Sequence, residues 1–125
     1  MTQATFSTLA INTKLDAVTA LLDGGVLELH EGSSDSQEPL ARLHFARPAF
    51  HEAVSGTARA YPLKAEEAAP REGTARRFVA LTTKGQLVLE GSVGTAHADL
   101  VLSSVAILVG TRVTISSFTL TEPKR

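Results

Sequence analysis

The spacing of the apolar residues indicates one helix near the start of the chain. Over residues 11–23 the apolar positions recur at intervals of three and four, which places them on one face of a helix. Asn12 or Thr13 can cap its beginning, and Gly24 with Gly25 favours an end there, because glycine accepts the left-handed conformation that follows many helices. The apolar face predicted in this way comprises Leu15, Val18, Leu21 and Leu22.

After the glycines the period changes to two. The segments VLELHE (26–31) and LARLHF (40–45) alternate apolar and polar residues, the pattern of strands with one dry and one wet face. Residues 74–94 predict a hairpin with its turn at Lys84-Gly85. Short apolar segments continue to residue 121, and the odd step between Ile115 and Phe118 predicts either a β-bulge near Ser116-Ser117 or a strand that passes between two sheets.

Six or seven short strands behind one helix predict a mainly β fold, an antiparallel β-sandwich or jelly-roll-like domain over residues 1–125. We expect an N-terminal arm (1–10), the helix (11–23), an irregular proline-containing arm (47–73) and a C-terminal tail (121–125). A short helix over 64–69 is an alternative within the arm. The predicted core comprises Leu15, Leu27, Leu29, Leu43, Phe45, Phe78, Leu87, Leu89, Leu100, Leu102, Ile107, Val113, Ile115 and Phe118.

Charge and composition narrow the classes of function. The 12 basic and 13 acidic residues give a net charge of −1, without the basic excess of a nucleic-acid binder. There is no cysteine, which excludes disulfides and thiolate chemistry. No signal-peptide pattern is visible, and the longest apolar run, residues 100–109, is too short to span a membrane. We therefore expect a protein made in a cytoplasm that binds neither nucleic acid nor membrane.

The polar residues show no pattern typical of catalysis or of metal binding. The four histidines lack the paired spacing of metal ligands. His30 and His44 lie near Ser33, Ser34 and Asp35 in the sequence, yet the strand–turn–helix context of a nucleophilic serine is missing. We expect both histidines on the surface, and we predict no catalytic residues, no cofactor and no metal.

The string GSVGTAHADLVLSSVAILVGTRVTISSFTLTEP, preceded by RRFVALTTKGQLVLE and LLDGGVLELHEG, resembles small virion-associated proteins of tailed bacteriophages and prophages. The matching segments are 21–24, 27–32, 78–93 and 99–121, whereas residues 47–73 have no counterpart. The resemblance implies a β-sandwich structural protein of the particle, such as a cement or decoration protein on the outside of the capsid. It implies no catalytic residue.

This resemblance implies the major capsid protein as a partner, together with further copies of the chain in a dimer or trimer. We expect the contacts to come from the termini and from residues 47–73. Alternatives are a tail or baseplate component, a free carbohydrate- or ligand-binding domain, and a small hydrolase in which His30 or His44 would lie near a serine. The candidate contact residues are Phe6, Phe50, Tyr61, Arg76 and Arg77.

Overall fold

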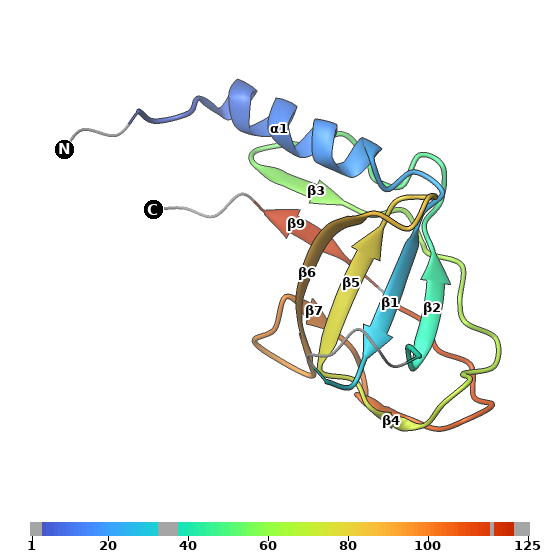
Figure 1. Cartoon of the computed structure of the whole chain (residues 1–125). Helices are drawn as coiled ribbons and strands as arrows, with labels where there is room; N and C mark the ends of the chain where they lie inside the picture. Colours follow the sequence, from blue (N-terminus) through green and yellow to red (C-terminus); the bar gives the residue numbers. More distant parts are fainter. Residues whose placement is uncertain (1–3, 33–37, 116, 122–125) are drawn as a thin grey trace.

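One curled five-stranded sheet forms the centre of the fold (Figure 1). The computed structural model describes residues 4–32, 38–115 and 117–121. The sheet has the order β2-β1-β5-β6-β7, with antiparallel neighbours except for the parallel pair β6–β7. Its strands are β1 (Val26–His30), β2 (Ala41–His44), β5 (Arg77–Leu81), β6 (Leu87–Gly94) and β7 (Leu100–Val101).

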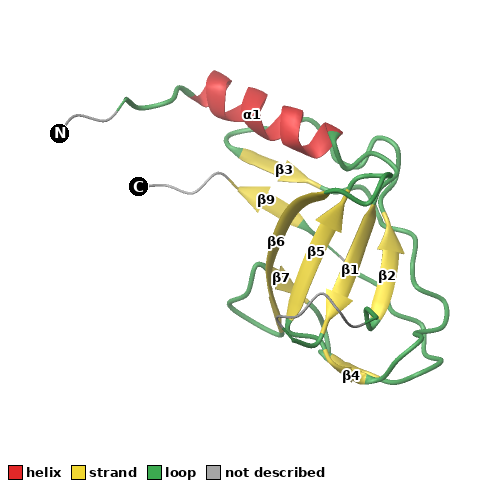
Figure 2. Cartoon of the chain, in the orientation of Figure 1, coloured by secondary structure: helices red, strands yellow, loops and turns green. Residues whose placement is uncertain are grey.

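Two small antiparallel sheets and one helix complete the described part of the chain (Figure 2). These elements are α1 (Thr8–Ala20), β3 (Thr57–Arg59) with β9 (Thr119–Thr121), and β4 (Gly73–Thr74) with β8 (Ala106–Ile107).

The prediction of a mainly β fold with one N-terminal helix is confirmed. The arrangement of the strands differs from the expected sandwich, since the described strands form one curled mixed sheet and two small sheets. The reason lies after residue 99, where each strand is only two or three residues long. Ser103-Ser104 and the turn at Gly110, with its φ of 81°, interrupt this part of the chain. The bulge expected near Ser116-Ser117 involves a residue outside the described ones.

α1 begins earlier than the sequence pattern predicts. Ser7 is its N-cap, and the Ser7 hydroxyl accepts a hydrogen bond from the backbone N–H of Ala10 (3.1 Å). Residues 8–10, expected in an arm, therefore form the first turn. Asn12, a candidate cap, lies inside the helix, where its side chain binds another segment.

The core lies between the inner face of the large sheet and the segments that cross it. Phe118 joins these layers, with ring centroids 5.4 Å from Phe78, 5.8 Å from Phe50 and 6.3 Å from Phe45. Leu89 and Val113 are partly buried, whereas Leu87 is 57% exposed. Leu87 begins β6, and β7 pairs only with the other end of that strand. The other predicted core residues are buried: Leu15, Leu27, Leu29, Leu43, Phe45, Phe78, Leu100, Leu102, Ile107, Ile115 and Phe118.

Residues 47–73 pair with several distant parts of the chain. Within this segment, β3 pairs with β9 and Glu66 pairs with Val113. Lys64 pairs with His44 and so covers the outer edge of β2. No helix forms over residues 64–69, because their backbone groups bond to these distant strands instead.

Side chains from α1 and from the turn after it hold the beginning of this segment. Each uses its Oδ1 atom to accept a hydrogen bond from a backbone N–H group. Such bonds satisfy donors that the short local strands leave unpaired. The pairs are Asn12 with Gly56 (2.9 Å), Asp16 with Ala53 (2.8 Å) and Asp23 with Ala49 (2.8 Å).

Candidate interaction surface

The face of α1 that points away from the strands is apolar and exposed. We call Phe6, Leu9 and Leu21 the outward face; Leu9 is 77% and Phe6 58% exposed. The opposite side of the helix packs into the core through Leu15 and Leu22. The sequence placed Val18 and Leu21 on that buried side. Leu21 is exposed because it follows the last residue of α1 as its C-cap, whereas Val18, 37% exposed, lies at the edge of the buried side beside Leu15 and Leu22.

Charges are scarce on α1. Lys14 and Asp16 are its only charged residues, and the Asp16 carboxylate accepts the bond from the segment below. The Nζ atom of Lys14 lies 4.0 Å from the centroid of the Phe6 ring. The remaining exposed positions, Thr13 and Ala17 among them, are small. A helix that faces only water normally carries charged residues on its exposed side, so this surface is suited to contact with protein.

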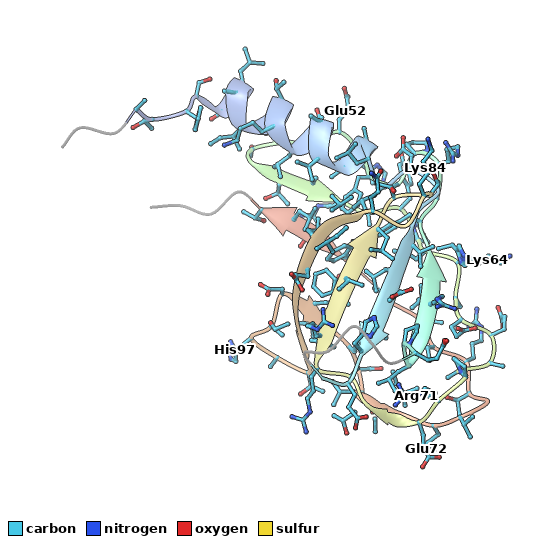
Figure 3. The ribbon with its side chains drawn as sticks, in the orientation of Figure 1. Glu52, Lys64, Arg71, Glu72, Lys84 and His97 are labelled. Carbon is cyan, nitrogen blue, oxygen red and sulfur yellow. The ribbon has the colours of Figure 1, made fainter. Side chains whose placement is uncertain are left out.

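A turn beside α1 extends the outward face. Val54 is 68% exposed at this turn, and Ser55 and Gly56 both have positive φ there. Figure 3 shows Glu52 next to α1, with its side chain pointing away from the strands. Among the described residues no side chain forms an ion pair with Glu52. One border of the outward face therefore carries a carboxylate that forms no ion pair with a described residue, although the guanidinium of Arg59 lies near it.

A shallow hollow of about 400 Å³ lies along the same turn. One wall is stiffened by His51, whose ring stacks on Tyr61 with centroids 3.7 Å apart. The hollow brings together a guanidinium, a carboxylate and two hydroxyls without the close contacts of a catalytic group. Its lining residues are His51, Glu52, Val54, Ser55, Thr57 and Arg59.

A second exposed apolar region lies at the other end of the molecule. Leu108 (61% exposed) and Val109 follow β8 directly, and we call this pair the tip. β8 pairs with β4, which lies at the end of the molecule away from α1 (Figure 1). The backbone N–H of Gly110 donates to the carbonyl of Ala69 (2.7 Å), which holds the tip in place. The tip and the outward face are therefore separate surfaces.

The outer face of the large sheet carries charged residues that neutralise one another. The carboxylate of Glu28 contacts Nε2 of His30 (2.9 Å) and accepts a hydrogen bond from Nε of Arg42 (3.0 Å). Arg77 donates to the carboxylate of Glu90 (3.1 Å). His30 is buried, contrary to the expectation of a surface histidine, because these long neighbouring side chains surround it. These ion pairs join neighbouring strands of the sheet, so their role is structural.

The candidate contact residues divide into three groups. Phe6 and Arg76 are exposed and Tyr61 is half-buried, so each remains accessible to a partner. Phe50 is buried among the phenylalanines of the core, so its choice as a contact residue was wrong. Arg77 is largely occupied by its bonds to Glu90 and to the backbone within the chain.

Leu9 and the tip are exposed apolar residues that were not expected from the sequence. Leu9 was assigned to the N-terminal arm rather than to the helix. Leu108 and Val109 were read as part of a strand. Their exposed fractions, 61% for Leu108 and 57% for Val109, show that both side chains turn outward.

The described residues offer no cluster of side chains typical of a metal site. No three of their histidine, aspartate or glutamate side chains are grouped as a metal site requires. Ser33, Ser34 and Asp35, considered for a hydrolase, lie outside the described residues. None of the helices in that part of the chain is both long and apolar enough to span a membrane.

Comparisons of the chain with protein-family models, with curated proteins and with solved structures found no match. The outward face and the tip are therefore the basis for the proposed function.

Proposed function

We propose that this protein is a non-enzymatic structural protein of a bacteriophage particle, which binds the outside of the capsid shell and bridges its subunits. The observation that carries the proposal is the pair of exposed apolar regions at opposite ends of the molecule, the outward face of α1 and the tip. A bridging protein needs two separate contacts, and the two exposed regions support that role. The sequence resemblance to virion-associated proteins is the reason for proposing a bacteriophage particle.

The size of the two regions fits repeated binding on a lattice. Burying one large apolar side chain contributes about 1.5–3 kcal/mol, so the two side chains of the tip give a weak contact when taken alone. A shell presents the same contact many times, and linked weak contacts act together through their effective concentration. Modest contacts at two ends are therefore enough for a protein that coats a shell.

Several acidic side chains also support a structural role, because they hold neighbouring strands together. The carboxylate of Asp99 accepts hydrogen bonds from the N–H and the hydroxyl of Ser92 (2.9 and 3.1 Å) and so holds β6 and β7 together. Glu28 is likewise committed to His30 and Arg42. These acidic groups are used to hold strands in place.

The test is binding to emptied shells of the phage or prophage whose genome carries the gene. We expect the wild-type protein to co-sediment with the shells and to raise their melting temperature. Leu108→Glu should weaken binding about tenfold or more, because it places a charge in the contact and removes about 1.5 kcal/mol or more of apolar burial. Leu87→Glu is the matched control, since Leu87 is an equally exposed leucine on β6.

Two results would contradict the proposal. One is a folded wild-type protein that does not bind the shells. The other is a Leu108→Glu variant that binds them as tightly as the Leu87→Glu control does.

A further inference from the structure

The middle of the outward face is suited to another helix. Its largest side chains, Leu9 and Leu21, lie near the two ends of α1, and the exposed positions between them include Thr13, Ala17 and Ala20. Helices pack with their axes about 8–10 Å apart, and small residues at the contact allow the closer distances. An occupant in the form of a helix would fill the space that these small residues leave.

The two borders of the outward face carry opposite charges. Lys14 and Asp16 are two positions apart, about 200° around a helix of 3.6 residues per turn, so they lie on opposite flanks of α1. Asp16 binds the backbone of Ala53, so Glu52 lies beside the Asp16 flank. One border therefore presents an ammonium group and the other a carboxylate.

We propose that the outward face binds a second copy of this chain. The two α1 helices lie side by side and run in the same direction about a two-fold axis. Such an axis brings each border against the opposite border of the other copy, so Lys14 of each chain meets Glu52 of the other. This inference rests on the proposed function, because it assigns a partner to one of the two apolar regions.

The exposed area suits a dimer of ordinary size. A standard interface buries about 800 Å² per partner, and a little over half of that, roughly 450 Å², is apolar. The exposed parts of the side chains offer on the order of 400 Å², at roughly 100–200 Å² for a fully exposed side chain. The side chains are those of Phe6, Leu9, Leu21 and Val54.

The dimer gives the bridging function its geometry. This two-fold axis is parallel to both helices and lies in the plane of contact. It therefore places the remainder of the two molecules on opposite sides of that plane. The two tips, each at the end of its molecule away from α1, therefore lie at opposite ends of the dimer. Each dimer then presents two identical shell contacts that point away from each other.

The test is a charge exchange, read by sedimentation velocity over a concentration series without any shells. We expect the wild-type chain to dimerise with a Kd on the order of micromolar. Lys14→Glu and Glu52→Lys should each weaken the dimer about fivefold or more, because each places like charges together at both contacts. The double variant should return to within about threefold of wild type, which is expected only if the two residues meet across the interface.

Two further variants separate the parts of the proposal. Leu9→Glu should abolish the dimer, and Leu87→Glu, the exposed control on β6, should leave it intact. Thermal melting of each variant checks that the monomer is folded. A wild-type chain that stays monomeric up to about 100 μM, or a double variant no stronger than the single ones, would overturn the inference.

The outcome is separable from that of the proposed function. A dimer that fails to bind shells overturns the proposed function and leaves the interface standing. A wild-type monomer that binds shells, and loses that binding in Leu9→Glu, shows that the face belongs to the shell contact and overturns the inference. Leu108→Glu should keep the dimer while losing the shells, which assigns the two regions to different partners.

Discussion

Replacing Phe118 by alanine should destabilise the fold more than a typical core substitution, because this ring joins separate layers. Phe118 is 3% exposed and precedes β9 directly, so it belongs to the small sheet. Its ring meets Phe78 of the large sheet edge to face at 5.4 Å, and Phe45 and Phe50 complete the cluster. Alanine there would leave a cavity lined by the three remaining rings.

The expected loss follows from the burial and the contacts. Removing a buried phenylalanine side chain costs about 3–5 kcal/mol when the cavity does not collapse. Each aromatic pair adds about 0.5–1.5 kcal/mol beyond area burial, so the upper half of that range applies here. We therefore expect a loss of about 4 kcal/mol, a large share of the ~5–15 kcal/mol of a domain this size.

Urea denaturation followed by circular dichroism measures this loss. Phe118→Leu, which keeps most of the volume but loses the ring contacts, should cost less than Phe118→Ala. Phe6→Ala is the matched control, because Phe6 is exposed, and it should change the free energy of unfolding by less than about 1 kcal/mol. A loss below about 1.5 kcal/mol for Phe118→Ala would refute the view that this ring joins the layers.

Two further substitutions test how the chain is held locally. Asp16→Ala removes the acceptor for the N–H of Ala53 and should cost about 1–2 kcal/mol in urea denaturation; a loss under about 0.5 kcal/mol would mean that the bond does not stabilise the fold. Gly25→Ala should cost about 3 kcal/mol or more in thermal denaturation, because the new Cβ would lie 2.1 Å from the carbonyl oxygen of Leu81. Gly32→Ala, which meets nothing within 4 Å, is its control, and equal melting temperatures for the two would contradict the reasoning.

Local patterns were sufficient for the strands that pair with near neighbours. β1 and β2 follow from the alternation of residues 26–31 and 40–45, and the hairpin β5–β6 from its apolar runs and its turn. Gly85 has the positive φ of 81° that such a turn requires. The strands in 47–73 were not predictable in this way, because their partners, such as Val113, lie far along the chain.

The candidate surface was harder to predict, because exposure depends on where a helix sits. The spacing of Leu15, Val18 and Leu22 indicates one buried stripe, and in the structure Leu15 and Leu22 are buried while Val18 lies at the edge of that stripe. Asn12 and Asp16 decide the rotation of α1, since each binds a backbone N–H of the segment below. Those acceptors look like ordinary helix residues in the sequence, so the exposure of Leu9 and Leu21 could not be recognised.

The pairing of β3 with β9 determines when, during synthesis, the outward face can be completed. Thr57 lies opposite Thr121, so this small sheet closes only after almost the whole described chain has been made. Closing such a long loop is slow compared with forming a local hairpin, and synthesis proceeds from the N-terminus at about 5–20 residues per second. α1 packs on β3 and is the first element to be synthesised, but its support is completed last. A growing chain therefore cannot present a finished outward face until translation has passed residue 121.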